Sequence, residues 1–292
     1  MNTDFLSTEN IPLSEVNHPL LKEREVKLFV KRDDLIHPFI SGNKWRKLKF
    51  NIEEMKRQEK KRMLTFGGAY SNHILATAAA GNKFGFRTVG IIRGEKPRKK
   101  NPVLKKADDF GMQFHFITRE EYRKKETKEF PEKLKNAFGE FYMVPEGGAN
   151  ELGVKGCKEI AGEIKIDYTH ICCCCGTGAT LAGIAISLPA GKKAVGFCVH
   201  KGGESVAENI NRWTSGADNF TIINDYHFGG FAKSTDELRV FAHEFSMETN
   251  IPVEPVYTAK MFFGIFDLVG KDFFERGSVL VALHTGGIHN YL

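Results

Sequence analysis

A glycine-rich turn in the second half of the chain is the clearest candidate for chemistry. Gly176, Thr177, Gly178 and Thr180 follow an apolar run and precede an apolar helical stretch that begins at Leu181. Glycines let the backbone approach an anion closely, the N–H groups at a helix start point outward, and the threonine hydroxyls add donors. The turn matches neither the dinucleotide fingerprint nor the Walker pattern. A plain tight turn is the alternative, but the residue types favour a phosphate site.

A second polar turn follows another apolar run. Ser71, Asn72 and His73 come after Gly67 and Gly68 and stand before a helical stretch of small residues. Ser71 or Asn72 could simply cap this helix, which is the commonest use of such residues at this position. The same geometry would also bind a carboxylate at the helix start and place a serine hydroxyl over it. Capping and substrate binding are therefore compatible.

Lys44 is the candidate for amine chemistry. It follows Ser41, Gly42 and Asn43 and stands in the first turn of a stretch with helical spacing. The positive end of a helix disfavours a positive side chain, so a partly buried amine here would have a lowered pKa. Lysines of that kind form Schiff bases with carbonyl groups. The alternative is an ordinary surface lysine, because three more basic residues follow within five positions.

The last apolar run of the chain also ends in polar residues. His284 and Thr285 follow the predicted strand Ser278–Leu283. In open parallel sheets, ligands bind at the carboxyl ends of the strands, so both side chains could reach a ligand. A buried histidine whose hydrogen bonds are satisfied within the protein is an equally good interpretation of His284.

The elements that must position these residues indicate an α/β fold. Short apolar runs alternate with glycine-containing turns and helical stretches, so parallel strands with crossover helices are the simplest architecture. We expect doubly wound open sheets. The predicted strands are Leu28–Lys31, Met63–Phe66, Thr88–Ile92, Gln113–Ile117, Tyr142–Val144, Thr169–Cys173, Lys193–Cys198 and Ser278–Leu283. The predicted helices are Asn72–Phe84, Val103–Phe110, Val154–Ile164 and Thr180–Ser187.

Four of the six cysteines are contiguous, at Cys172–Cys175. Side chains alternate between the two faces of a strand, so these thiols cannot close one tetrahedral metal site. We therefore predict a buried strand in which the thiols act as small hydrophobic groups, and no metal.

Composition excludes several classes of protein. The chain has 292 residues, 41% of them hydrophobic and 27% charged, which is the ordinary mixture of a folded globular protein. No apolar stretch is long enough to cross a bilayer and no secretory signal is recognised, so we expect a cytoplasmic protein without membrane contact. The net charge of +6 comes largely from basic runs that lack interleaved aromatic residues or alternate with glutamate. They favour solvated surface over nucleic-acid binding.

Five motifs together resemble the aminocyclopropanecarboxylate deaminase and D-cysteine desulfhydrase family of pyridoxal-phosphate enzymes. They are Ser41–Leu48, Gly67–His73, Gly176–Gly183, Glu254–Lys260 and His284–Gly287, and their order and spacing agree over nearly the whole chain. The resemblance implies a fold-type-II enzyme of the tryptophan synthase β superfamily, with two doubly wound open sheets. It implies a large domain at residues 1–46 plus 156–292 that binds pyridoxal 5'-phosphate, a small covering domain at 47–155, and a homodimer.

The resemblance also assigns roles by position. Lys44 falls on the Schiff-base lysine, which would then take the α-proton of the substrate, and Ser71 and Tyr257 fall on the other catalytic residues. Ser71, Asn72 and His73 fall where the substrate binds. The positions implied to contact the cofactor are Lys44, Asn72, Gly176, Thr177, Gly178, Thr180, Thr258 and Thr285.

Departures from the family pattern bear on the substrate. Aminocyclopropanecarboxylate deaminases carry a glutamate and a leucine where this chain has Thr258 and Thr285, whereas desulfhydrases carry small hydroxyl residues there. A second family tyrosine is replaced by Phe231, and Glu254 stands in place of an aspartate. The resemblance therefore implies elimination from D-cysteine, giving a 2-oxo acid, ammonia and sulfide. Ring-opening deamination, another reaction of this fold type, a low-turnover cofactor-binding protein and a nucleotide-binding protein are the alternatives.

Overall fold

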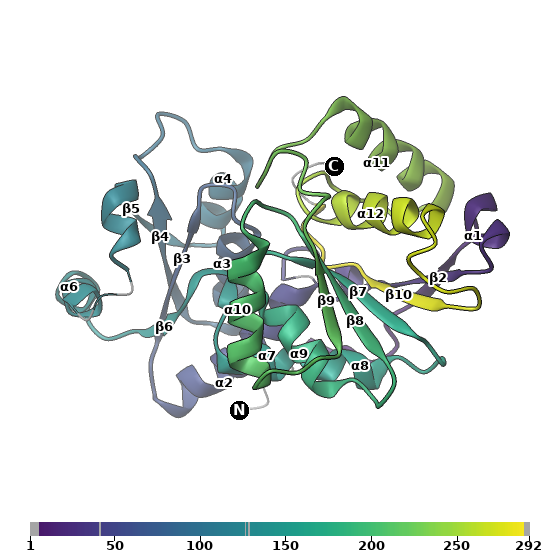
Figure 1. Cartoon of the computed structure of the whole chain (residues 1–292). Helices are drawn as coiled ribbons and strands as arrows, with labels where there is room; N and C mark the ends of the chain where they lie inside the picture. Colours follow the sequence, from purple (N-terminus) through teal and green to yellow (C-terminus); the bar gives the residue numbers. More distant parts are fainter. Residues whose placement is uncertain (1–5, 41, 126, 128, 289–292) are drawn as a thin grey trace. The chain divides into compact units, whose positions relative to one another are not determined.

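The chain forms two compact units (Figure 1). The computed structural model describes residues 6–40, 42–125, 127 and 129–288. Of these, residues 44–153 make the first unit, and residues 6–43 with 154–288 make the second. Ser41, the first residue of one predicted motif, lies outside the described residues.

The second unit contains a six-stranded sheet in which every neighbouring pair is parallel except the first. In spatial order its strands are β1 (Leu13–Val16), β2 (Lys27–Lys31), β10 (Val279–Leu283), β7 (His170–Cys175), β8 (Lys193–Cys198) and β9 (Phe220–Ile223). Its helices are α1 (Pro19–Glu23), α8 (Glu159–Glu163), α9 (Ala179–Ser187), α10 (Gly203–Thr214), α11 (Asp236–Thr249) and α12 (Thr258–Gly270). A 3-10 turn, η1, spans Asp33–Leu35.

The cysteine strand β7 lies inside this sheet, between β10 and β8. Cys172 and Cys174 belong to the apolar core that α12 covers. The opposite face of the sheet contacts α9, because a Cβ added at Gly196 of β8 would lie 2.5 Å from Leu181 and 2.7 Å from the Cys175 sulfur. The prediction of a buried strand with alternating thiols is confirmed, and all six cysteines are buried and free.

The first unit contains a four-stranded parallel sheet with helices on both faces. In spatial order its strands are β5 (Gln113–Ile117), β4 (Arg87–Arg93), β3 (Arg62–Gly68) and β6 (Tyr142–Val144). Tyr122, Phe130 and Leu134 from two helices pack on one face, and Ile74 packs against Gly67 and Gly90 on the other. The helices are α2 (Asn43–Arg57), α3 (Asn72–Phe84), α4 (Pro102–Asp109), α5 (Arg119–Arg123) and α6 (Glu129–Phe138), with the 3-10 turn η2 (Glu146–Gly148).

The eight predicted strands are confirmed, with ends that shift by at most two residues. The prediction of one helix over Val154–Ile164 is wrong, because the chain forms α7 (Glu151–Cys157) and then α8. The N–H of Lys158 is shared between the carbonyls of Val154 and Lys155, which marks the break. In the described part of the chain, no helix combines the length and apolarity that a bilayer span needs.

Two fully buried histidines, His73 and His284, make folding sensitive to acid. Burial lowers the pKa of both below the ordinary 6.5. Below pH 6.5 the unfolded chain therefore binds protons that the folded chain does not, and each histidine removes up to about 1.4 kcal/mol of stability per pH unit. Burial raises the pKa of Glu254 from 4.5 to about 7. Between these two pH values, protonation of Glu254 therefore stabilises the folded chain as the pH falls. This single carboxyl offsets only part of the loss caused by the two histidines.

We therefore expect the free energy of unfolding, measured by urea titration, to fall as the pH is lowered from 6.5. His73→Gln should make this fall shallower. A stability that stays constant down to pH 5, or an equally steep fall in the variant, would contradict the assignment.

Candidate functional site

The glycine turn joins β7 to α9 in the second unit. Gly178 is the N-cap of α9, has a φ of +87° and supplies no capping side chain. A Cβ at this position would lie 2.9 Å from Ile210 of α10, so glycine is required by both conformation and space. The first N–H groups of a helix lack intrahelical partners. The turn therefore keeps donors available at the carboxyl edge of the sheet, as the sequence predicts.

The two threonines of this turn differ in their hydrogen bonding. The Thr180 hydroxyl is buried and accepts a hydrogen bond of 2.9 Å from the Asn43 side chain. The Thr177 hydroxyl is also buried, but it has no hydrogen-bond partner among the described residues. A ring nitrogen of His200 lies 2.9 Å from the Gly176 carbonyl oxygen and ties the turn to the end of β8. Thr177 thus carries an unused donor beside an uncapped helix.

Gly42 brings the segment before Lys44 against the C-terminal turn of the second unit. Its φ is +58°, and its N–H donates to the Asp33 carbonyl at 2.8 Å. A Cβ at Gly42 would lie 1.9 Å from the Thr285 carbonyl oxygen. Two predicted motifs that lie more than 240 positions apart are therefore in backbone contact. Asn43 then joins this pair to the glycine turn.

Glu254 organises the start of α12. Its buried carboxylate accepts backbone N–H groups from Val256 at 2.7 Å, Tyr257 at 3.0 Å and Thr258 at 2.8 Å. In return, the Thr258 hydroxyl accepts the N–H of Glu254 at 2.9 Å. This reciprocal arrangement satisfies the first N–H group of α12, at Thr258, and the two N–H groups that precede the helix. It holds Tyr257 and Thr258, two predicted site residues, in fixed positions.

Replacing Glu254 with glutamine should destabilise the protein by about 1–3 kcal/mol, because the amide keeps one acceptor oxygen and presents N–H groups to backbone N–H groups. The midpoint of thermal unfolding is the measurement. Glu248→Gln, an exposed position near the end of α11, is the matched control and should be neutral. An unchanged midpoint for Glu254→Gln would mean that the cap contributes little.

Tyr257 lies beside the glycine turn and beside Phe231. A Cβ at Gly176 would lie 3.7 Å from the Tyr257 ring, and the ring of Phe231 meets that of Tyr257 edge-on, with centroids 5.7 Å apart. The loop that precedes Phe231 is held by Lys260. This fully buried ammonium donates to the carbonyls of His227 and Gly230, each at 2.9 Å, and of Val199 at 3.2 Å.

His284 is a satisfied core histidine, which was one of the two interpretations of the sequence. One ring nitrogen lies 2.7 Å from the Pro252 carbonyl oxygen, and the other accepts the Gly286 N–H at 3.2 Å. Its Nδ1 is also 3.5 Å from the Asp34 carboxylate. The residue fixes the turn that carries Thr285, which is itself buried.

In the first unit, Ser71 is the N-cap of α3, and its hydroxyl accepts the Ile74 N–H at 3.4 Å. The capping interpretation is therefore confirmed for Ser71. Asn72 and His73 begin the helix at the carboxyl end of β3. The three residues that the sequence groups as a substrate site thus share one helix start.

His73 is buried and has one unused nitrogen. Thr65 donates its hydroxyl proton to the Val144 carbonyl, so the His73 Nε2, 2.8 Å from the Thr65 oxygen, carries the proton as a donor. The Nδ1 is then an acceptor, and it has no hydrogen-bond partner among the described residues. Burial lowers the pKa of His73, and the positive charges of Lys44 and Lys47 lower it further. Lys44 thus lies near this neutral ring, in the first turn of α2 as predicted.

Sequence reasoning gave no role to Asn43, His200 or Lys260. Asn43 and His200 hold the glycine turn through single hydrogen bonds, and no sequence pattern reports such contacts. Lys260 did leave a signal, since it is a lysine among the apolar residues of the first half of helix α12, whose only other charged residue is Asp267. An ammonium group on such a helix must find buried acceptors or reach solvent.

The chain is similar to known proteins in both sequence and fold. The model of the family described as "Pyridoxal-phosphate dependent enzyme" matches residues 7–286. A mitochondrial protein of Arabidopsis thaliana, named bifunctional D-cysteine desulfhydrase/1-aminocyclopropane-1-carboxylate deaminase, is 30% identical, covering 90% of this chain and 72% of its own length. The D-cysteine desulfhydrase of Klebsiella pneumoniae (strain 342) is 25% identical, covering 89% and 87%. A crystal structure of an ACC deaminase homologue superposes with a TM-score of 0.83 and 27% identity, covering 98% and 91%.

Proposed function

Because the chain belongs to the family of pyridoxal-phosphate dependent enzymes, we propose that it is a lyase that converts D-cysteine and one water molecule into sulfide, ammonia and a 2-oxo acid. The relatives named D-cysteine desulfhydrase support this substrate. The alternative, ring-opening deamination of 1-aminocyclopropane-1-carboxylate, is the second activity in the name of the Arabidopsis relative. The choice between them rests on the residues that stand near Tyr257.

The residues of the glycine turn fit the phosphate group of the cofactor. The unpartnered, buried hydroxyl of Thr177 and the uncapped start of α9 are donors that a phosphate oxygen would satisfy. Thr180 is fixed by Asn43 at the same helix start. We assign Gly176, Thr177, Gly178 and Thr180 to the phosphate, and Asn72, Thr258 and Thr285 to the rest of the cofactor.

Lys44 is assigned two tasks in this proposal, covalent attachment of the cofactor and acceptance of the α-proton of the substrate. When bound, pyridoxal phosphate supplies an electron sink for the carbanion that loss of this proton would leave. A base must have a pKa near the working pH. Lys44 stands in the first turn of α2, where the helix dipole disfavours a positive charge.

Ser71, Asn72 and His73 are assigned to the substrate carboxylate. A carboxylate is stabilised at a helix start by the N–H groups and the helix dipole. The neutral His73 ring keeps Nδ1 as an acceptor, which suits it to fix a polar hydrogen of the substrate or of a neighbouring side chain rather than to bear charge. Tyr257 is assigned to proton transfer at the leaving group.

The side chain of Thr258 is the main evidence for the choice between the two substrates. Its hydroxyl is fully buried and engaged with Glu254, so position 258 supplies no carboxylate beside Tyr257. The cyclopropane substrate has no α-hydrogen, and its ring opening cannot start with proton removal by Lys44. D-Cysteine has that hydrogen and carries a sulfur leaving group. The residues present therefore suit elimination better than ring opening.

Product analysis tests the proposal. The purified, cofactor-loaded protein is incubated with D-cysteine, L-cysteine, D-serine and 1-aminocyclopropane-1-carboxylate, and sulfide, ammonia and 2-oxo acids are measured. We expect sulfide and a three-carbon 2-oxo acid in equal amounts from D-cysteine. A four-carbon 2-oxo acid from the cyclopropane at a higher kcat/KM would favour the alternative. The cofactor spectrum without product from any of the four would indicate a binding protein of low turnover.

Assembly, location and the domain division remain part of the proposal. We propose a cytoplasmic homodimer, in keeping with the family resemblance, in which residues 1–46 and 156–292 bind the cofactor and residues 47–155 cover it. Sedimentation at several protein concentrations would measure the oligomeric state.

A further inference from the structure

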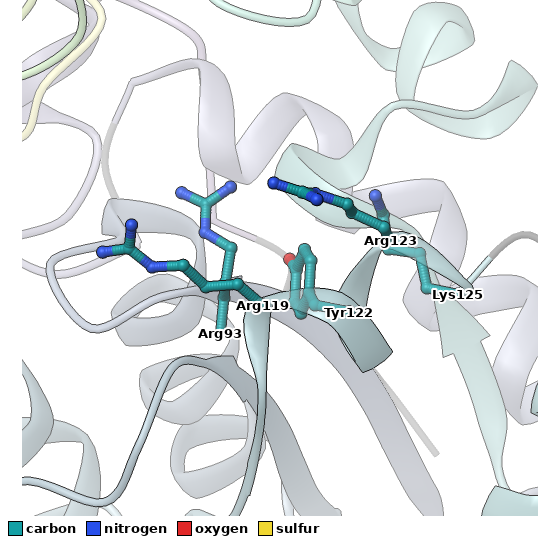
Figure 2. A pocket seen from close by; sticks show the side chains of 5 residues that line it. All are labelled: Arg93, Arg119, Tyr122, Arg123 and Lys125. Carbon is teal, nitrogen blue, oxygen red and sulfur yellow. The ribbon is translucent and has the colours of Figure 1, made fainter.

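A cleft in the first unit lies among residues to which the proposed reaction gives no role. It has a volume of about 380 Å³ and is lined by Arg93, Arg119, Tyr122, Arg123 and Lys125 (Figure 2). Arg93 ends β4, and the neighbouring strand β5 leads directly into α5, which carries the next three of these residues. The cleft, called here the arginine cleft, therefore stands at the carboxyl edge of a parallel sheet, where such sheets bind ligands.

The positive charge of the arginine cleft is largely uncompensated. Among the described residues, no carboxylate lies within ion-pairing distance of Arg93, Arg119 or Arg123, whereas Lys125 has Glu146 at 3.6 Å. The two carboxylates of α5 pair with lysines outside the cleft, Glu120 with Lys124 and Glu121 with Lys133. Three guanidinium groups thus surround the cleft, and each presents a fork of donors that suits an oxyanion.

Tyr122 supplies a second, independent observation. Its ring is packed against Phe66, with centroids 6.2 Å apart, and the residue is only 2% exposed. Its hydroxyl is buried and makes no hydrogen bond of acceptable geometry among the described residues, and the Glu146 carboxylate lies close enough to act on it. Burial, with Glu146 adding to it, raises the pKa of this phenol, so the oxygen keeps its proton and is a donor. The guanidinium carbon of Arg93 and the ammonium of Lys125 lie 5.4 Å and 4.9 Å from the centre of the ring.

We infer that the arginine cleft binds a small ligand through a doubly charged tetrahedral oxyanion, as in inorganic phosphate or a phosphate monoester. Figure 2 shows the Tyr122 hydroxyl between Arg93 and Arg119 on one side and Arg123 and Lys125 on the other. An anion above it would accept the phenol proton and bidentate bonds from the arginines. A singly charged carboxylate would leave most of this charge unmatched. The residues that line the cleft all belong to the first unit, whereas the glycine turn belongs to the second, and the inference does not depend on the proposed reaction.

Calorimetric titration of the cofactor-loaded protein tests the inference, because loading already fills the phosphate site of the glycine turn. Inorganic phosphate, phenyl phosphate and acetate are the probes, in phosphate-free buffer at constant ionic strength. We expect saturable binding of one equivalent of both phosphates, and acetate binding at least about tenfold weaker. Tighter binding of phenyl phosphate than of phosphate would identify an organic monoester as the ligand. Absence of saturable phosphate binding, or equal binding of acetate, would overturn the inference.

Variants locate the binding. The double variant Arg119→Gln, Arg123→Gln changes two exposed side chains and should weaken phosphate binding at least about tenfold. Arg87→Gln is the matched control, because Arg87 is an exposed arginine at the opposite end of the same strand as Arg93. An equal loss in the control, or no loss in the double variant, would place the anion elsewhere.

Tyr122→Phe separates a binding role from a structural one. The change removes a buried hydroxyl without a partner, so the thermal midpoint of the phosphate-free protein should stay constant or rise. Phosphate affinity should nevertheless fall by several fold, and the arginines should still give residual binding. Unchanged phosphate affinity in this variant would remove the phenol from the site and contradict the inference as stated.

Discussion

Replacing Lys44 with alanine is expected to eliminate the visible absorption band of the protein–cofactor linkage and to lower the rate of product formation by about 10²–10⁴-fold from the loss of proton transfer alone. The band is expected to depend on this one amine because Lys44 stands in the first turn of α2 and directly follows Asn43, which is fixed to Thr180 of the glycine turn. Spectra and product formation with D-cysteine are the measurements. Lys56→Ala, an exposed lysine of the same helix, is the control and should retain both.

The fully buried lysines are poorer candidates for this linkage than the half-buried Lys44. Lys31 is paired with Asp33 at 2.6 Å and Glu163 at 2.8 Å, and Lys260 donates to three carbonyls. Lys47 is buried one turn further along α2, so a chemical label is needed to show which of Lys44 and Lys47 carries the cofactor. Reduction of the loaded protein with borohydride, followed by peptide mass mapping, identifies the modified residue. A label on Lys47, or a band that persists in Lys44→Ala, would refute the assignment.

Much of the fold could be predicted because the chain alternates in a regular way between buried strands and glycine-containing turns. The run Cys172–Cys175 is so apolar that a buried strand was the simplest interpretation, and the structure places it between two parallel neighbours. The strand β1 escaped prediction because it is a short antiparallel edge strand of mixed residues. The helix α5 escaped as well, since its five residues are nearly all charged.

The site was predictable only as a set of separate turns. Ser71 and Gly178 occupy helix starts that sequence rules describe directly. The contacts that join the turns of the second unit, between Asn43 and Thr180 and between Gly42 and Thr285, are tertiary, and no local pattern encodes them. In the sequence, Glu254 stands where the family has an aspartate, and only the structure shows that its carboxylate accepts three backbone N–H groups at and just before the start of α12. Likewise, the sequence predicts only an ordinary turn at Gly42, and the structure shows that this residue contacts the backbone of Thr285.

Gly42→Ala is therefore expected to be among the most damaging single-methyl changes in the described part of the chain. The added Cβ would lie 1.9 Å from the Thr285 carbonyl oxygen and 2.8 Å from the Gly286 nitrogen, both backbone atoms that cannot swing aside. The left-handed φ of +58° adds strain for alanine. We expect a loss of at least about 3 kcal/mol in the free energy of unfolding, together with weaker cofactor binding, because the shifted segment leads directly into Asn43 and Lys44.

Gly85→Ala distinguishes steric contact from backbone strain. Gly85 also has a left-handed φ, of +74°, but a Cβ there would meet nothing within 4 Å. Its replacement should cost only the conformational penalty, about 1–2 kcal/mol, and should leave cofactor affinity unchanged. The difference between the two variants in urea unfolding measures the contact between Gly42 and Thr285. Equal losses of stability and equal cofactor affinities in the two variants would show that Gly42 and Thr285 are not in contact. The proposal that this contact positions Lys44 would then be wrong.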